Sequence, residues 1–399
     1  MFITMSNSLL DMKYITEIKP GTYRISIRAG KSIDGKNLYN TKQISNATLK
    51  EAQKLRDKMW KNNDEKIGID GNARFQDFAR FYLQNSAFNA HTGSTYDGEE
   101  SKIRNHIIPY IGNMKLKEIT SITIQKLINY LKDKDSCRHN EKGEVVKLSP
   151  TTIKHVYNIL SGMFTYAIEM ELLNKNPCKG VTIPKGVKYQ PVVYTIEEIN
   201  ELIEKLKQSN LTIQKKCIII LAMSLGARRG ELAGITYDQI DLKNKIIYVK
   251  YSYSETKSKG KEMKDTKTPS GVRAVGLNDI AVEMLEKHFK EQERLKKEFG
   301  STWENVPNIF TNGPHGVIKP DSISRSWSRF VKSRKLKYAP LKNLRTSFAT
   351  YLAYKGMAPK ELQTIMGHGN YRTTMEYYQV AYDDYAQKMV QFTNDIGDK

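Results

Sequence analysis

The last part of this 399-residue sequence gathers side chains that together could attack a phosphodiester bond. Arg345 lies in the run KNLR, His368 in the run MGH and Tyr378 in the run TTMEYY. A tyrosine hydroxyl is an oxygen nucleophile, an arginine neutralises charge on phosphoryl oxygens, and a histidine hydrogen-bonds or moves a proton. Tyr377, which directly precedes Tyr378, is the alternative nucleophile.

A second cluster of charged residues lies far upstream, in the run GARRGEL at residues 226–232. The planar guanidinium of an arginine suits two non-bridging oxygens of one phosphate. Arg228 and Arg229 both offer this group. Glu231 is better suited to orienting an arginine than to acid–base work, so we expect it to be a buried ion-pair partner.

A lysine-rich run lies between these two clusters. Residues 246–249 and 272–275 predict strands, and the turn-forming run 252–270 joins them. The lysines of this run could contact phosphates or donate a proton; they are Lys257, Lys259, Lys261, Lys264 and Lys267. Residue type alone does not choose among them.

Together these residues resemble the tyrosine recombinase family, specifically the phage-integrase type of conjugative transposons and prophages. That family has an arginine in a G-x-R-x-x-E-L box, a lysine in a β-hairpin, an H-x-L-R box, an L-G-H box and a nucleophilic tyrosine. The G-x-R spacing favours Arg228 over Arg229, and the T-T-x-x-x-Y spacing favours Tyr378, with Tyr377 as its rival. The matching positions are Arg228, Lys267, Arg345, His368 and Tyr378.

The resemblance implies a role for each matching residue. Arg228 and Arg345 would clamp the phosphate, His368 would bond a phosphoryl oxygen, and Lys267 would protonate the 5′ leaving oxygen. Attack by Tyr378 would leave a 3′-phosphotyrosine and a free 5′-hydroxyl. Because the bond energy stays in that link, we expect no cofactor and no metal. The sequence also lacks a G-x-x-x-x-G-K-[ST] loop and a carboxylate cluster of the metal-ligand type.

One position departs from the family pattern, because Lys342 stands where the H-x-L-R box has its histidine. A lysine keeps positive charge beside the phosphate, but it is a poor base while it is protonated. We therefore expect Lys342 to join the catalytic group as a cation or as a hydrogen-bond donor to oxygen.

The composition favours a folded protein with a polyanionic partner. Lysine and arginine number 64 against 43 acidic residues, which gives a formal net charge of +21, and 39% of the residues are hydrophobic. In a folded chain of this size such an excess favours nucleic acid over membrane. Three scattered cysteines, no signal-peptide pattern and no apolar run of about 18 residues predict a cytoplasmic protein without a membrane span.

Residues 1–70 predict a small DNA-binding domain of three strands and one helix. Hairpin turns are expected at Pro20-Gly21 and Asp34-Gly35, and a capping box at residues 48–51 opens the helix. One helix covers only one face of such a sheet, and the uncovered face would suit the major groove. This domain resembles the arm-binding domain of conjugative-transposon integrases. The expected residues of the open face are Tyr23 or Arg24, Arg28, Tyr39 and Lys42, with Arg24, Arg28 and Lys42 as candidate DNA contacts.

Residues 71–185 predict a helical domain that resembles the family's core-binding, SAM-like domain. Phe75, Phe78, Ala79 and Tyr82 recur at helical spacing, and Ser149-Pro150 is a typical helix start. Residues 133–147 are polar and irregular, and we expect a loop there. The Pro-, Gly- and Lys-rich segment 176–190 predicts an interdomain linker.

Residues 186–399 predict a mainly α catalytic domain with a small β-sheet or hairpin, so the whole chain is expected to be a multidomain α+β protein with the tyrosine recombinase fold. The resemblance implies site-specific integration and excision of a mobile element by a homo-tetramer on double-stranded DNA. A directionality factor or a host DNA-bending protein is an expected accessory partner. The alternatives are DNA relaxation of the type IB topoisomerase kind and a catalytically inactive DNA-binding regulator.

Overall fold

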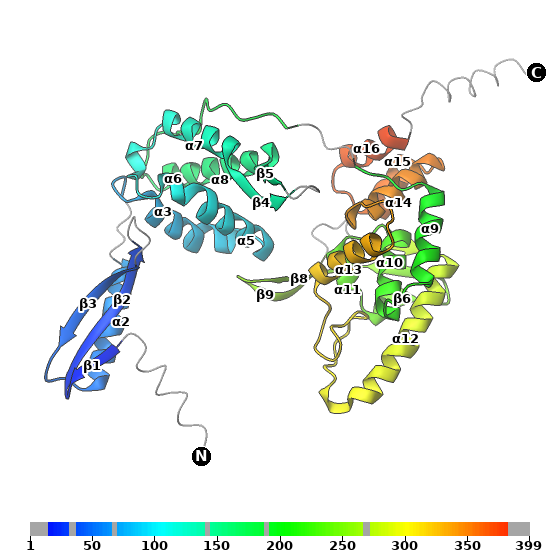
Figure 1. Ribbon diagram of the computed structural model, residues 1–399, viewed down its shortest axis with the longest axis horizontal. Coiled ribbons are helices and arrows are strands. Elements are labelled where there is room, and N and C mark those ends of the chain that lie inside the picture. The colour runs from blue at the N-terminus through cyan, green and yellow to red at the C-terminus, as the bar shows by residue number, and fades with distance from the viewer. Residues whose placement is uncertain are drawn as a thin grey trace, which may run out of the picture. The chain divides into compact units, whose positions relative to one another are not determined.

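The computed structural model of this protein describes residues 15–31, 37–65, 70–139, 144–186, 191–265 and 272–381. Its chain divides into two compact units, Met1–Val187 and Lys188–Lys399 (Figure 1). Small antiparallel sheets accompany a larger set of helices, which confirms the predicted α+β class. None of the described helices combines the length and the apolar composition of a membrane span.

The N-terminal part of the first unit is the expected three-stranded antiparallel sheet, with one helix along one face (Figure 1). Its elements are β1 (Ile15–Lys19), β2 (Thr22–Lys31), β3 (Asn37–Ile44) and α2 (Leu49–Glu65). One bond of the predicted capping box is present, from the Thr48 amide to the Glu51 carboxylate at 2.8 Å. Ala52 and Met59 on the helix pack against Ile25 on the sheet.

The register of this sheet decides which residues share a face. Ile25 pairs with Lys42, and Arg24 pairs with Gln43. Residues directly opposite each other on neighbouring strands project from the same face. Ile25 and Tyr23 are buried against α2, so Arg24 and Gln43 lie on the open face. The prediction for Lys42 was wrong in this respect, because Lys42 lies on the face that α2 covers.

The rest of the first unit is the expected helical block around one hydrophobic core. Phe75, Phe78, Ala79 and Tyr82 form the predicted buried stripe, and Ser149 caps the helix that begins at Pro150. The α-helices are α3 (Phe75–Tyr82), α4 (Phe88–Ala90), α5 (Gly93–Lys102), α6 (Ile108–Ile111), α7 (Ser121–Asp133) and α8 (Pro150–Glu169). Shorter helical turns are η1 (Leu83–Ala87), η2 (Ile103–Ile107) and η3 (Leu116–Glu118).

The loop predicted for residues 133–147 is a β-hairpin instead. Its strands are β4 (Asp135–His139) and β5 (Val145–Lys147), which pair antiparallel. All residues of β5 are exposed, including Val145 and Val146. A strand that has no buried face needs no alternation of polar and apolar residues, and so the sequence pattern did not reveal this hairpin.

The second unit is mainly helical, as predicted. Its helices are α9 (Ile196–Lys207), α10 (Ile213–Leu225), α11 (Arg229–Gly234), α12 (Asp279–Phe299), α13 (Pro320–Ser333), α14 (Lys342–Tyr354), α15 (Pro359–Met366) and α16 (Tyr371–Ala381). Its strands are β6 (Ile240–Asp241), β7 (Ile246–Val249), β8 (Tyr251–Thr256), β9 (Gly260–Asp265) and β10 (Arg273–Gly276), and its short 3₁₀ turns are η4 (Tyr237–Gln239) and η6 (Gly300–Thr302).

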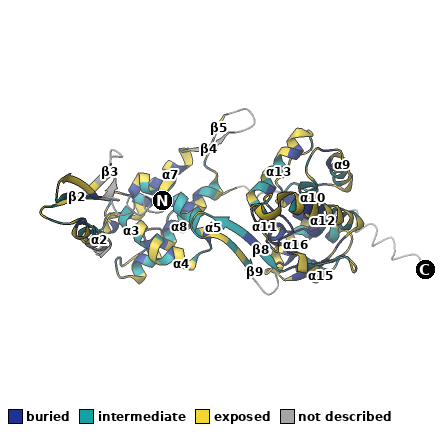
Figure 2. Ribbon diagram, turned by 90° about the horizontal axis from the view of Figure 1, so that it is seen from below, coloured by how far each residue is buried: buried dark blue, intermediate teal, exposed yellow. Residues whose placement is uncertain are grey.

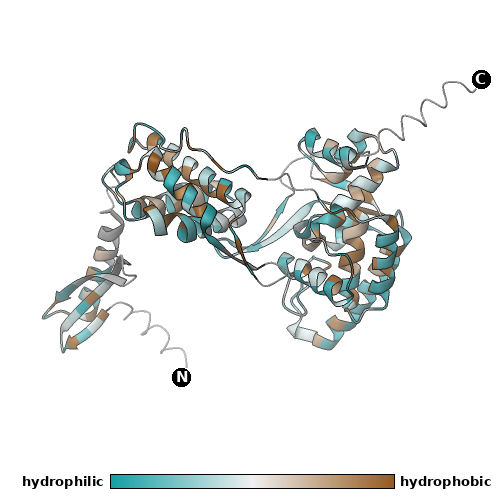
Figure 3. Ribbon diagram, turned by 45° about the horizontal axis from the view of Figure 1, so that its top comes forward, coloured by the Kyte–Doolittle hydropathy of each residue, from teal (hydrophilic) through white to brown (hydrophobic). Residues whose placement is uncertain are grey.

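The apolar helix α10 contributes most of its length to the core of this unit. Hydrophobic and hydrophilic residues occupy different faces of the surrounding helices (Figure 3). Strands β10, β7 and β6 form one small sheet. Two of these strands, β7 and β10, correspond to the strands predicted at residues 246–249 and 272–275. The run expected to connect them holds a further hairpin, β8 with β9, whose residues are mostly half-buried or exposed (Figure 2).

Candidate active site

Arg228 lies at the start of α11, directly after the chain has left α10 through Gly226. Gly226 has a left-handed backbone with φ of 55°, and a Cβ there would lie 2.6 Å from the Phe348 ring, so glycine is required. The Arg228 side chain donates to the Glu231 carboxylate at 2.6 Å, and its amide donates to the same carboxylate at 2.9 Å. Glu231 thereby orients the guanidinium, while 51% of the Arg228 side chain stays exposed.

Arg345 lies in the first turn of α14 and is buried. Its guanidinium donates to the Gly226 carbonyl at 2.6 Å and also to the Met366 carbonyl. These two carbonyls belong to the C-terminal ends of α10 and α15, where unpaired carbonyls and the helix dipole favour a cation. Arg345 therefore bridges the C-terminal ends of α10 and α15. Each of these helices ends at a glycine with a left-handed backbone, Gly226 or Gly367.

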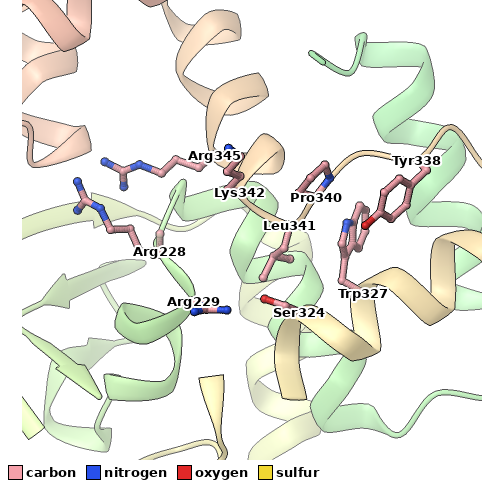
Figure 4. A pocket seen from close by; sticks show the side chains of 10 residues that line it. Arg228, Arg229, Ser324, Trp327, Tyr338, Pro340, Leu341, Lys342 and Arg345 are labelled. Atoms are coloured by element: carbon pink, nitrogen blue, oxygen red, sulfur yellow. The ribbon is translucent and has the colours of Figure 1, made fainter. Parts of the chain in front are cut away.

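A cavity of about 350 Å³ opens beside these two arginines. Figure 4 shows the guanidinium groups of Arg228 and Arg345 pointing to the same side. Lys342, one turn before Arg345, also lines the cavity, as does Arg229. Arg229 forms an ion pair with Asp321 at 2.7 Å, whereas Arg228 forms its ion pair with Glu231. The remaining lining residues are Ala227, Ser324, Trp327, Tyr338, Pro340 and Leu341.

Glu231 is the buried anion at the centre of three arginines. Arg273 donates to it at 2.7 Å from the side opposite the solvent, and Arg345 lies 3.9 Å away. Burial alone would raise the pKa of this carboxyl, but the charge and hydrogen bond of Arg273, followed by those of Arg228, lower the pKa to about 2. Glu231 is therefore ionised at any working pH.

Arg273 was not among the predicted site residues, although its position in the sequence carries a signal. In the run VRAV, Arg273 occupies the same face of its strand as Val275, and both side chains are buried. A charged residue at an inward position of a strand must be paired. The partner, Glu231, is distant in sequence, and its identity therefore required the structure.

His368 follows Gly367 at the end of α15 and is buried. Its Nδ1 lies 3.0 Å from the hydroxyl oxygen of the buried Thr374, a second residue that sequence analysis missed. Burial, followed by the charges of Arg345 and Arg228, lowers the pKa of His368 to about 4. The imidazole is thus neutral at neutral pH and can exchange hydrogen bonds without adding charge.

The two tyrosines of α16 have different surroundings. The Tyr378 side chain is buried, its hydroxyl donates to the Met357 carbonyl, and its ring belongs to a small core between α14, α15 and α16. The Tyr377 ring stacks on His368, with centroids 5.6 Å apart and an interplanar angle of 13°. The structure therefore brings Tyr377 to His368 and holds the Tyr378 hydroxyl on the Met357 carbonyl.

Two family models match parts of this chain. Residues 193–384 match the phage integrase family, and residues 74–132 match the phage integrase N-terminal SAM-like domain. The chain belongs to the phage integrase family of tyrosine recombinases. Members of this family are DNA strand-transferring enzymes, and the predictions of family, fold and enzyme class are confirmed.

Several relatives of this recombinase match over nearly their whole length. A XerC-like tyrosine recombinase of Caldanaerobacter subterraneus is 26% identical over 94% of this chain and 96% of its own. The ICEBs1 integrase of Bacillus subtilis is 23% identical over 96% of this chain and 99% of its own. The Tn1549 transposon integrase, solved in complex with transposon right end DNA, shares the fold with a TM-score of 0.65 at 20% identity, covering 80% of this chain and 99% of that one.

The other predicted site residues of this recombinase lie elsewhere or outside the described part. Lys267 falls within residues 266–271, which the structure does not describe. Arg24 is exposed on the open face of the N-terminal sheet, where it lines a shallow hollow with Ser26, Tyr39, Thr41 and Gln43. The side chain of Arg28 is not among the described ones, and Lys42 is exposed on the other face.

The folded state of this recombinase is expected to lose stability as the pH falls from 6.5 towards 4, in part because of His368. The pKa of this residue is lowered from 6.5 to about 4, so within that window the unfolded chain binds a proton that the folded chain does not. Urea unfolding at several pH values measures the effect. A His368→Gln variant should unfold with a weaker pH dependence, and an unchanged dependence would contradict the low pKa.

Proposed function

We propose that this protein is a site-specific recombinase that integrates and excises a mobile DNA element. The observation that carries the proposal is the pair Arg228 and Arg345, which line one cavity and whose guanidinium groups point to the same side (Figure 4). Glu231 orients the first, and two backbone carbonyls hold the second. Donors that are held in place in this way stabilise the charge that develops on a phosphoryl group under attack.

In the proposed reaction the Tyr378 oxygen forms a bond to phosphorus, and the bond from phosphorus to the 5′ oxygen breaks. The phenol proton passes to solvent water, and Lys267 supplies a proton to the departing 5′ oxygen. His368 offers Nε2 to a phosphoryl oxygen, since Nδ1 faces Thr374. Lys342, which lines the cavity, adds positive charge there. The product is a 3′-phosphotyrosine that a second DNA 5′-hydroxyl can resolve.

The proposed division of labour assigns residues 1–70 to arm-type DNA, residues 71–185 to the crossover core and residues 186–399 to catalysis. Separate hydrophobic cores in the sheet, the helical block and the catalytic part support this division. Strand exchange between two duplexes requires cuts at four positions, and we therefore propose a homo-tetramer on DNA that works in the cytoplasm. A directionality factor or a host DNA-bending protein would set the direction of the reaction.

Suicide duplexes made from the element ends test this function. The expected result is a covalent protein–DNA adduct on a denaturing gel, followed by strand transfer when a partner duplex is added. Relaxation of supercoiled plasmid without a partner duplex would indicate the topoisomerase alternative. Tight binding without any adduct would indicate an inactive regulator.

Arg24 and Lys42 provide a matched test of the arm-binding role, because they lie on opposite faces of one sheet. Arg24→Ala should weaken binding to arm-type DNA by about tenfold or more, as expected for the loss of a groove contact worth about 1–3 kcal/mol. Lys42→Ala should have a much smaller effect. Fluorescence anisotropy with arm-site and core-site duplexes measures both, and equal losses from the two variants would contradict the proposed face.

A further inference from the structure

We propose that Arg273 is a positioning residue of the phosphate clamp that Arg228 and Arg345 form. Arg273 binds Glu231 from the buried side and supplies the surplus positive charge of this cluster. This inference rests on the recombinase function proposed above. Arg273 does not line the cavity and is not part of the family boxes in the sequence. It would act on the phosphate only through Glu231 and Arg228.

The geometry places the Glu231 carboxylate between two guanidinium groups. On the buried side, Arg273 donates to Oε2 at 2.7 Å, and only 1% of the Arg273 side chain is exposed. On the outer side, Arg228 donates to Oε1 at 2.6 Å with half of its side chain exposed. Pairing of β10 with β7 fixes the backbone of Arg273 opposite the buried Val249. The orientation of Arg228 thus depends on a carboxylate that Arg273 anchors.

The charges of the cluster suit a transition state better than a bound substrate. Arg228, Arg273 and Arg345 surround one carboxylate, Glu231, so these four groups together carry a surplus of two positive charges, to which the neutral His368 adds none. A phosphodiester carries one negative charge, whereas a phosphorane-like transition state carries two. Groups that match the transition state more closely than the ground state raise the rate without an equal gain in binding.

Loss of the Arg273 charge would therefore affect rate more than affinity. The surplus positive charge would fall from two to one. Glu231 would then bind Arg228 more strongly, although Arg228 must also bind the phosphate. Among the described residues, Arg228 and Arg345 also lie beside this carboxylate, His368 interacts with its charge, and Tyr377 interacts with Arg345. Without Arg273 these groups must keep a buried carboxylate ionised, so Glu231 should gain a proton at a higher pH.

The test uses the full-length protein with the substitutions Arg273→Gln and Arg273→Lys. Arg294→Gln is the matched control, because Arg294 pairs with Glu291 on the surface of α12, with 59% of its side chain exposed. Single-turnover cleavage of a suicide duplex is measured from pH 5 to 8, together with DNA affinity and thermal midpoint. We expect Arg273→Gln to cleave about 100-fold more slowly with affinity within about threefold. Its rate should also fall more steeply on the acid side than that of the parent protein.

Arg273→Lys retains the charge with fewer donors, and it should recover about tenfold of the lost rate. Equal losses of rate and affinity, or a rate that keeps the parent's pH profile, would overturn the proposal in favour of a purely structural role. If Arg273→Gln does not fold, Arg273→Lys decides alone: a parent-like rate and pH profile would overturn the proposal. Failure of the unsubstituted protein to form any adduct would instead reject the recombinase function, and this inference with it.

Discussion

Replacing Tyr378 with phenylalanine is expected to abolish the covalent protein–DNA adduct while leaving duplex affinity nearly unchanged. The substitution removes only the hydroxyl, and without this oxygen no bond to phosphorus can form. Affinity should persist, because cationic contacts with the backbone dominate binding to DNA. A suicide duplex resolved on a denaturing gel measures the adduct, and a gel-shift or anisotropy titration measures binding.

Tyr377→Phe is the matched control, because it removes the neighbouring hydroxyl and keeps the ring that stacks on His368. This variant should still form the adduct. The control matters because the structure places Tyr377 beside His368 and holds the Tyr378 hydroxyl on the Met357 carbonyl. Cleavage by Tyr378→Phe, together with its loss in Tyr377→Phe, would assign the nucleophile to Tyr377.

Local spacing revealed the parts of the site whose partners lie close together in the chain. Arg228 and Glu231 are three residues apart across the first turn of α11, and so their pairing could be expected from the run GARRGEL. Stripes of apolar residues and capping boxes likewise predicted most helices, because these signals repeat within a few residues.

Contacts between distant segments could not be predicted in the same way. Arg273 is 42 residues from Glu231, and Arg345 is 119 residues from the Gly226 carbonyl that it binds. The face of Lys42 depended on the register of β3 with β2, which a one-residue shift would reverse. The surroundings of Tyr378 depend on how α16 packs against α14 and α15, and no spacing within the run TTMEYY reveals that packing.

The two arginines of the clamp should differ in what their removal does to the fold. Arg228→Ala and Arg345→Ala should each slow cleavage by about 100-fold or more, since removing one preorganised donor costs about 3 kcal/mol at the transition state. Arg228 is half exposed, and without it Glu231 still pairs with Arg273. The thermal midpoint of Arg228→Ala should therefore stay close to that of the parent protein.

Arg345→Ala should lower the thermal midpoint as well as the rate, because its guanidinium is buried and bonds the carbonyls of Gly226 and Met366. Leaving two buried carbonyls at helix ends without a donor costs about 1–3 kcal/mol for each of them. Arg345→Lys retains the charge but cannot reach both carbonyls with one planar group, and it should recover stability only in part. Calorimetry and single-turnover cleavage on the same preparations separate the two effects. If Arg228→Ala loses as much stability as Arg345→Ala, the two arginines serve as structural anchors. If either variant loses affinity as much as rate, they serve as simple phosphate anchors rather than as a clamp for the transition state.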